Sequence, residues 1–66
     1  MKITLNGREK ECADRVSLQN IVEQFCKDGR RIVAEVNGTI VQSQQWAQKI
    51  LSPGDTIELV SLVGGG

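Results

Sequence analysis

The residues best suited to chemistry are three consecutive glycines, Gly64, Gly65 and Gly66, which follow an apolar stretch over residues 57–63. Glycine has no side chain to pack and loses the most conformational freedom on ordering, so a glycine string outside a core is useful where backbone must be thin or mobile. A C-terminal carboxyl group is ionised at neutral pH. The Gly66 carboxylate can therefore attack the α-phosphate of ATP, and a sulfur nucleophile would convert the resulting acyl-adenylate into a thiocarboxylate.

The glycine tail is too short, and too costly to order, to bind a partner by itself. Three extended residues reach at most about 10 Å, and ordering them costs roughly 3 to 6 kcal/mol. The folded body must supply the affinity, and Val60 and Leu62, which share one face of the preceding strand, are the candidate docking residues. For Val60 and Leu62, burial in the core stays open as an alternative. For the three glycines, the alternative is a frayed end or a cloning remnant.

The composition lacks the residues of an in-chain active site. The sequence has no His and no Tyr, so acid-base catalysis would fall to carboxylates and lysines that no motif groups together. Cys12 and Cys26, with no His in the chain, cannot supply a zinc ligand set of the usual spacing, and we expect two free thiols. The chain is therefore not expected to be an enzyme acting alone or to bind a metal.

Charge and hydropathy argue against two further classes of protein. Eight basic residues balance eight acidic ones and are scattered, which is not the pattern of a nucleic-acid-binding surface. No apolar stretch approaches the roughly 20 residues that span a bilayer, so we expect no membrane association. Met1 opens directly into an alternating strand without a secretory signal, and we expect a cytoplasmic protein.

The first element in the chain is a hairpin. Apolar and polar residues alternate over residues 1–5, which is the period of a strand with one buried face. Asn6-Gly7 is the strongest short hairpin signal. A two-residue loop would place Ile3 opposite Lys10, whereas a bulged turn would bring the two glutamates of residues 8–12 inward. Either way the second strand carries charge on its inner side and belongs at a sheet edge.

A single amphipathic helix follows the hairpin. Ser17 is a suitable N-cap, the helix should run from residue 18 to about residue 28, and Gly29 should end it in the left-handed cap position. Its apolar stripe has helical spacing and is expected to pack in the core: Leu18, Ile21, Val22 and Phe25.

Residues 32–41 predict a second hairpin, with Asn37-Gly38 as its turn. The polar segment after it predicts a short helical turn, in which Trp46 packs half-buried with Ile50 or Leu51 over the open end of the sheet. The alternative is an exposed Trp46 that anchors a partner, because tryptophan is enriched at interface hot spots.

The last strand, from residue 56, is apolar on both faces, with Ile57 and Leu59 on one of them. Such a strand is usually central in its sheet, and we place it beside the first strand. This element order predicts an α+β fold of the β-grasp type, a mixed sheet of four to five strands with one main helix packed on one face. Residues 1–63 would form the domain and residues 64–66 a flexible C-terminal tail.

Over nearly its whole length the chain resembles the sulfur carrier proteins of thiamine biosynthesis, the ThiS family, whose fold is a ubiquitin-like β-grasp. The glycine pair is also shared with ubiquitin-like modifiers and with the small subunit of molybdopterin synthase, and Gly64 extends that pair by one residue. The resemblance rests on the compact size and on four features: the first hairpin leading to Cys12, Asn37-Gly38 followed by Val41 and Trp46, the Gly54-Asp55-x-Ile57 turn, and the terminal Gly65-Gly66.

The resemblance implies a cycle in which an E1-like adenylyltransferase binds ATP and Mg²⁺ and adenylates Gly66. Sulfur that originates from a cysteine desulfurase is then loaded, and thiazole synthase receives it from the thiocarboxylate. Gly64 and Gly65 would be the slim stalk that enters the partner's active site. Three alternatives stay open: a sulfur carrier for molybdopterin synthesis, a ubiquitin-like protein modifier, and a non-reactive β-grasp binding module.

Overall fold

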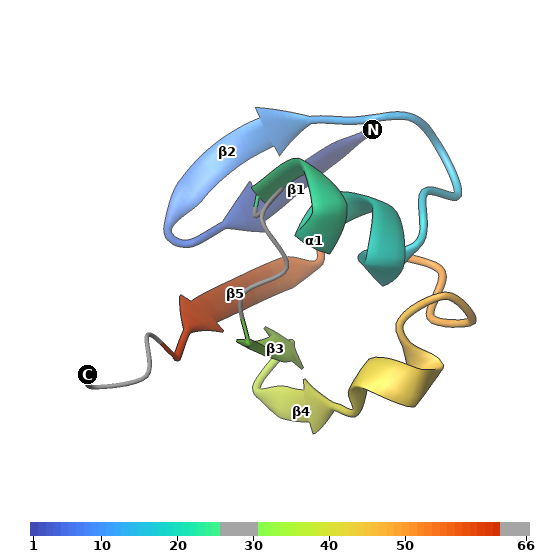
Figure 1. Cartoon of the computed structure of the whole chain (residues 1–66). Coiled ribbons are helices and arrows are strands. Elements are labelled where there is room, and N and C mark those ends of the chain that lie inside the picture. The colour runs from blue at the N-terminus through green and yellow to red at the C-terminus, as the bar shows by residue number, and fades with distance from the viewer. Residues whose placement is uncertain (26–30, 63–66) are drawn as a thin grey trace.

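The computed structural model describes residues 1–25 and 31–62, in which one helix packs on one face of a five-stranded sheet (Figure 1). The strands form that sheet in the order β2-β1-β5-β3-β4. A mixed sheet with a single main helix is the architecture that the sequence predicted. In chain order the elements are β1 (Lys2–Leu5), β2 (Arg8–Glu11), α1 (Leu18–Phe25), β3 (Ile32–Val36), β4 (Thr39–Val41), the short 3₁₀ helix η1 (Ser43–Gln45) and β5 (Thr56–Ser61).

The first hairpin has the register of a two-residue loop. Ile3 of β1 lies opposite Lys10 of β2. Asn6 and Gly7 both have positive φ angles, 49° and 82°, as a type I′ turn requires. The bulged alternative is therefore wrong, and the two glutamates of β2 point away from the helix. As predicted, β2 lies at an edge of the sheet.

Strand β5 occupies the centre of the sheet, as its two apolar faces predicted. It runs parallel to β1, with Leu5 opposite Ile57, and antiparallel to β3, with Ala34 opposite Leu59. The arrows of β1 and β5 in Figure 1 therefore point the same way. Consequently the turn after β1 lies at the same end of the sheet as the C-terminal end of β5.

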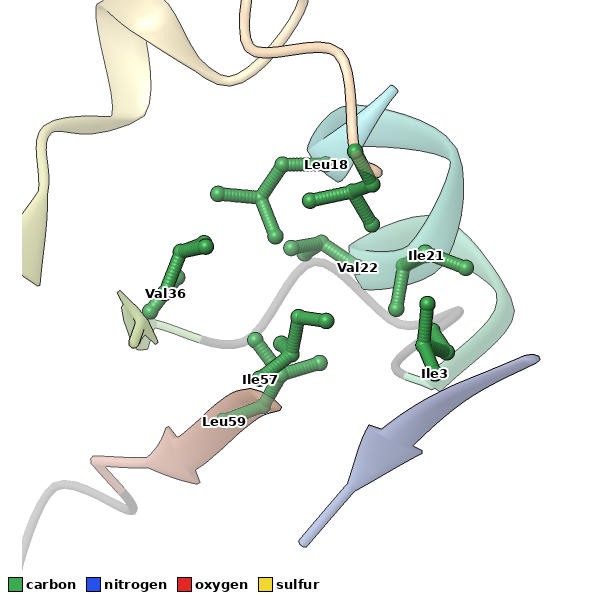
Figure 2. Close-up of a cluster of buried hydrophobic side chains, with 9 residues drawn as sticks. Ile3, Leu18, Ile21, Val22, Val36, Ile57 and Leu59 are labelled. Atoms are coloured by element: carbon green, nitrogen blue, oxygen red, sulfur yellow. The ribbon is translucent and has the colours of Figure 1, made fainter. Parts of the chain in front are cut away.

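The core fills the space between α1 and the sheet (Figure 2). The helix begins as predicted, because the backbone N–H of Asn20 donates to Ser17 Oγ at 3.2 Å and so satisfies one of the free amides of the first turn. Leu18 and Ile21 on α1 and Ile57 on β5 are completely buried. The buried hydrophobic residues are Ile3, Leu18, Ile21, Val22, Ala34, Val36, Leu51, Ile57 and Leu59.

Phe25 does not complete the buried stripe of the helix, contrary to the prediction. Its side chain is 44% exposed. It lies on the last described turn of α1, beyond Leu18, Ile21 and Val22, which already cover the sheet. Helical spacing correctly identified the buried face of the helix but not that burial stops at Val22.

Trp46 packs against the body of the protein, as the first of the two interpretations required. It is half-buried beside the core, and its indole N–H donates to the carbonyl oxygen of Val41 at 2.9 Å. Of the two residues predicted to pack with Trp46, Leu51 is buried and Ile50 is exposed. The indole N–H is thus already used within the chain, which disfavours Trp46 as a partner anchor.

Three expectations fall on residues outside the described ranges: the end of the helix near residue 28, the cap at Gly29, and the state of Cys26. Cys12 is a free thiol, partly buried against the core.

Candidate functional site

The candidate site begins with the sheet face that α1 leaves uncovered, which we call the outer face. Successive side chains of a strand point to opposite faces, so residues next to buried ones belong to it. On β5, buried Ile57 and Leu59 alternate with exposed Glu58 and Val60. The outer face comprises Lys2, Thr4, Glu9, Glu11, Val33, Glu35, Ile40, Thr56, Glu58 and Val60, together with Leu62 just past the end of β5.

Val60 and Leu62, the two predicted docking residues, are exposed on this face at 53% and 49%. Val60 lies opposite Val33 in the β3–β5 register. The backbone N–H of Leu62 donates to the carbonyl oxygen of Arg31 at 2.8 Å, so regular pairing continues to the last described residue. Burial of the two side chains in the core, the alternative left open by the sequence, is therefore wrong. Their role in docking stays a prediction.

The predicted reactive residue and its stalk, Gly66, Gly65 and Gly64, lie outside the described residues. The structure therefore defines the site up to Leu62, from which four residues lead to the terminal carboxylate in the sequence.

The outer face is acidic although the chain as a whole is neutral. Its strands carry Lys2 and four glutamates, and Arg31 lies beside Leu62 just before β3. Two of the glutamates, Glu35 and Glu58, are direct cross-strand partners. Among the residues described, neither of this pair forms an ion pair. Like charges directly opposite each other destabilise a sheet. The pair escaped notice in the sequence because its detection needs the register between β3 and β5.

Two asparagines hold the backbone of β5 through their side chains, and the sequence suggested only turns at both positions. Asn6 Oδ1 accepts from the N–H of Leu59 at 2.8 Å, and its Nδ2 donates to the Leu59 carbonyl oxygen at 3.3 Å. At the other end of the strand, Asn37 Oδ1 accepts from the N–H of Thr56 at 2.9 Å. No local pattern indicates such contacts, because Asn6 and Leu59 are 53 positions apart.

Two further features of the described residues can be compared with the candidate site: possible metal ligands and a groove beside β4. No group of three His, Cys, Asp or Glu residues among them could hold a metal ion. An open groove of ≈ 590 Å³ lies against β4, but Lys49 is the one ionisable residue in its lining. None of the helical segments in residues 1–25 and 31–62 is long and apolar enough to cross a membrane.

Comparison with known sequences gives a consistent family. The model of the ThiS family matches residues 3–66. The sulfur carrier protein ThiS of Escherichia coli is 32% identical over 66 residues, which is the full length of both chains. A thiazole synthase of Paramagnetospirillum magneticum is 30% identical over 66 residues, and there the match spans all of this chain but only 20% of the relative.

A solved structure supports the fold. The crystal structure of the thiamine biosynthesis protein ThiS from Geobacter metallireducens superposes with a TM-score of 0.81 over the full length of both chains, at 21% identity. At 21% identity this similarity is evidence for the fold alone. It confirms the predicted ubiquitin-like β-grasp.

Proposed function

The chain belongs to the ThiS family of sulfur carrier proteins, and on that premise we propose that its Gly66 carboxylate carries sulfur for thiazole formation in thiamine biosynthesis. The protein is a carrier and not itself a catalyst: an E1-like adenylyltransferase activates it, and thiazole synthase unloads it. The observation that carries the proposal is that the family match runs to the last residue, so that it includes all three terminal glycines.

The chemistry takes two steps at the terminal carbonyl carbon. In the first, a carboxylate oxygen of Gly66 attacks the α-phosphorus of ATP and pyrophosphate leaves, which gives an acyl-adenylate. In the second, sulfide attacks the carbonyl carbon and AMP leaves, which gives the thiocarboxylate. Sulfur delivered as a persulfide from a cysteine desulfurase needs, in addition, a thiol that reduces the resulting sulfur–sulfur bond.

The body of the protein supplies the recognition that the tail cannot. Val60 and Leu62 present exposed apolar side chains at the C-terminal end of the central strand, six and four positions before Gly66 in the sequence. Burying an apolar side chain at an interface gains roughly 1.5 to 3 kcal/mol. Docking through this end of the outer face would offset the cost of ordering the glycines in the partner's cleft.

Thiazole synthase is favoured as the acceptor over a molybdopterin-pathway enzyme by one of the sequence relatives. The relative named thiazole synthase includes a region similar to the whole of this chain. ATP and Mg²⁺ would be held by the activating enzyme, and the carrier would need no cofactor of its own. We place the cycle in the cytoplasm, in keeping with the absence of a membrane-spanning helix among the described residues.

Adenylation can be tested separately from sulfur transfer by ATP–pyrophosphate exchange. We expect the E1-like enzyme to exchange radioactive pyrophosphate into ATP only when the carrier is present. A chain that lacks Gly64, Gly65 and Gly66 should not support the exchange, and Gly66→Ala should support it poorly because the added methyl group obstructs the approach to the nucleotide. Equal exchange with and without the three glycines would contradict the assignment of the reactive group.

A further inference from the structure

We propose that Asn6 is a positioning residue for sulfur loading. Its side-chain amide holds the C-terminal half of β5, and through it the position of Leu62 at the end of the described strand. This inference rests on the proposed function, because it assigns Asn6 a role in delivering Gly66 to the activating enzyme.

The side chain of Asn6 extends the parallel ladder between β1 and β5 by one peptide group. The ladder starts with the N–H of Thr4 donating to the Asp55 carbonyl and the N–H of Asn6 donating to the Ile57 carbonyl, both at 2.9 Å. The main chain then turns away into β2 and cannot make the next step. The Asn6 amide makes it instead, because Oδ1 accepts from Leu59 N–H at 2.8 Å and Nδ2 donates to the Leu59 carbonyl.

Without this amide, the last part of β5 would be held from one side only. Beyond Leu59, the backbone pairing of β5 is with β3, where Val33 lies opposite Val60 and Ile32 opposite Ser61. The regular pairing with β1 ends one step earlier, at Ile57. Because Leu62 follows Leu59 by three residues, a change in the angle of the strand end would shift the docking residues Val60 and Leu62.

The chain contains its own control for this idea. Asn37 has the same residue type, the same place in a turn and a similar φ, 52° against 49° for Asn6. It too binds β5 through its side chain, since Oδ1 accepts from Thr56 N–H at 2.9 Å and Nδ2 donates to Asp55 Oδ1 at 3.0 Å. These contacts hold the beginning of β5, at the end of the strand remote from the tail.

The substitutions Asn6→Gly and Asn37→Gly remove the side-chain contacts and keep the turns, because glycine suits positive φ in a type I′ turn. We would measure stability by urea unfolding, hydrogen exchange of the Leu59 amide by NMR, and steady-state loading by the activating enzyme with ATP and sulfide. Asn6→Asp is the conservative variant: its carboxylate still accepts from Leu59 N–H but cannot donate to the Leu59 carbonyl.

Asn6→Gly should lose more stability than Asn37→Gly, because the side-chain hydrogen bonds of Asn6 are partly buried and those of Asn37 are exposed. Only Asn6→Gly should speed Leu59 exchange beyond the change in global stability. Misplacement of a reacting group by about 1 Å can cost 10²-fold in rate, and we expect kcat for loading to fall by roughly tenfold in Asn6→Gly. KM should change less, since Val60 remains exposed on the outer face. Asn6→Asp should fall between Asn6→Gly and the unchanged chain, and it keeps the test available if Asn6→Gly does not fold.

Equal loading of Asn6→Gly and Asn37→Gly, either unimpaired or equally impaired, would overturn the inference and leave the proposed function standing. Failure of the unchanged chain to load at all would overturn the proposed function and this role of Asn6 with it.

Discussion

Glu35 of β3 and Glu58 of β5 lie directly opposite each other on the outer face, with no ion-pair partner among the described residues. A cross-strand pair of like charges weakens a sheet by an amount similar to that gained from an opposite pair, roughly 0.2 to 1 kcal/mol. The central strand pair of the protein therefore carries an electrostatic cost at the face we assign to partner recognition.

Removal of either charge should stabilise the protein. We expect Glu58→Thr to raise the free energy of unfolding by about 0.2 to 1 kcal/mol, because threonine also favours strands. The gain should shrink in a Glu35→Thr background and at high salt, which screens the repulsion. Urea unfolding of the four members of this double-mutant cycle measures the coupling. A gain that is the same in both backgrounds would contradict a Glu35–Glu58 interaction.

Docking through the outer face should be sensitive to polar substitution at Val60 and Leu62. Val60→Thr keeps the shape of the side chain and its preference for strands, and Leu62→Ser removes an exposed apolar side chain. Each should weaken binding to the activating enzyme by about 1 kcal/mol or more, roughly fivefold in Kd.

The matched control for docking is Ile50→Ser, since Ile50 has the same 49% exposure as Leu62 but does not belong to the outer face. It should bind normally in the same calorimetric titration. Equal losses of binding affinity for Leu62→Ser and Ile50→Ser would show a general effect of exposed apolar area. That result would contradict a role of the outer face in docking.

The two faces of β5 should respond differently to truncation. Ile57 is completely buried, so Ile57→Ala should cost about 2 to 5 kcal/mol. A 66-residue chain has roughly 3 to 10 kcal/mol of stability in total, so this variant should lose a large share of its stability. Val60→Ala, on the exposed face, should cost no more than about 1 kcal/mol. Circular dichroism during urea unfolding distinguishes the two, and similar losses would contradict the observed alternation.

Stability should fall as the pH rises above 8, because the Met1 amino group is held in its charged form. A hydrogen bond with the Asp14 carboxylate raises the pKa of this amino group above its ordinary value of 8.0, against the opposing effect of desolvation. The charges of Asp14 and Glu11, at 3.2 and 3.5 Å, raise it further. Since the folded-state pKa is the higher one, the stabilisation is complete below pH 8 and is lost as the pH rises through the folded-state value.

This fall of stability with rising pH is tested by measuring the urea midpoint of unfolding from pH 7 upward, on the chain with a free Met1 amine. The variant Asp14→Asn should start less stable and lose less stability over the same range. Parallel curves for the two proteins would contradict the assignment of the slope to this amino group.

Local sequence patterns predicted the parts of the structure that local physics decides. The period of two in β5 correctly separated buried Ile57 and Leu59 from exposed Val60. Asn6-Gly7 correctly predicted a hairpin, although the sequence left its register open between a two-residue loop and a bulged turn. The same patterns could not predict how far the sheet extends under the helix, which left Phe25 exposed. That extent depends on the tertiary arrangement of α1 over the strands.

The candidate site divides in the same way. The alternation of Val60 and Leu62 gave their face from sequence alone, whereas the contact of Asn6 with Leu59 joins residues 53 positions apart and follows only from the parallel pairing of β1 with β5. The Glu35–Glu58 pair likewise depends on the register of β3 against β5. Gly64, Gly65 and Gly66 lie outside the described residues, so their role stays a prediction from the sequence and the family.

The most direct test of the central claim is the intact mass of the chain after incubation with the activating enzyme, ATP, Mg²⁺ and sulfide. We predict a product in which one oxygen is replaced by sulfur, and fragmentation should locate that sulfur at Gly66. The product should be absent without ATP and absent from a chain that lacks Gly64, Gly65 and Gly66. An unchanged mass under conditions in which the enzyme loads an established ThiS protein, or sulfur found at Cys12 or Cys26 instead, would contradict the account.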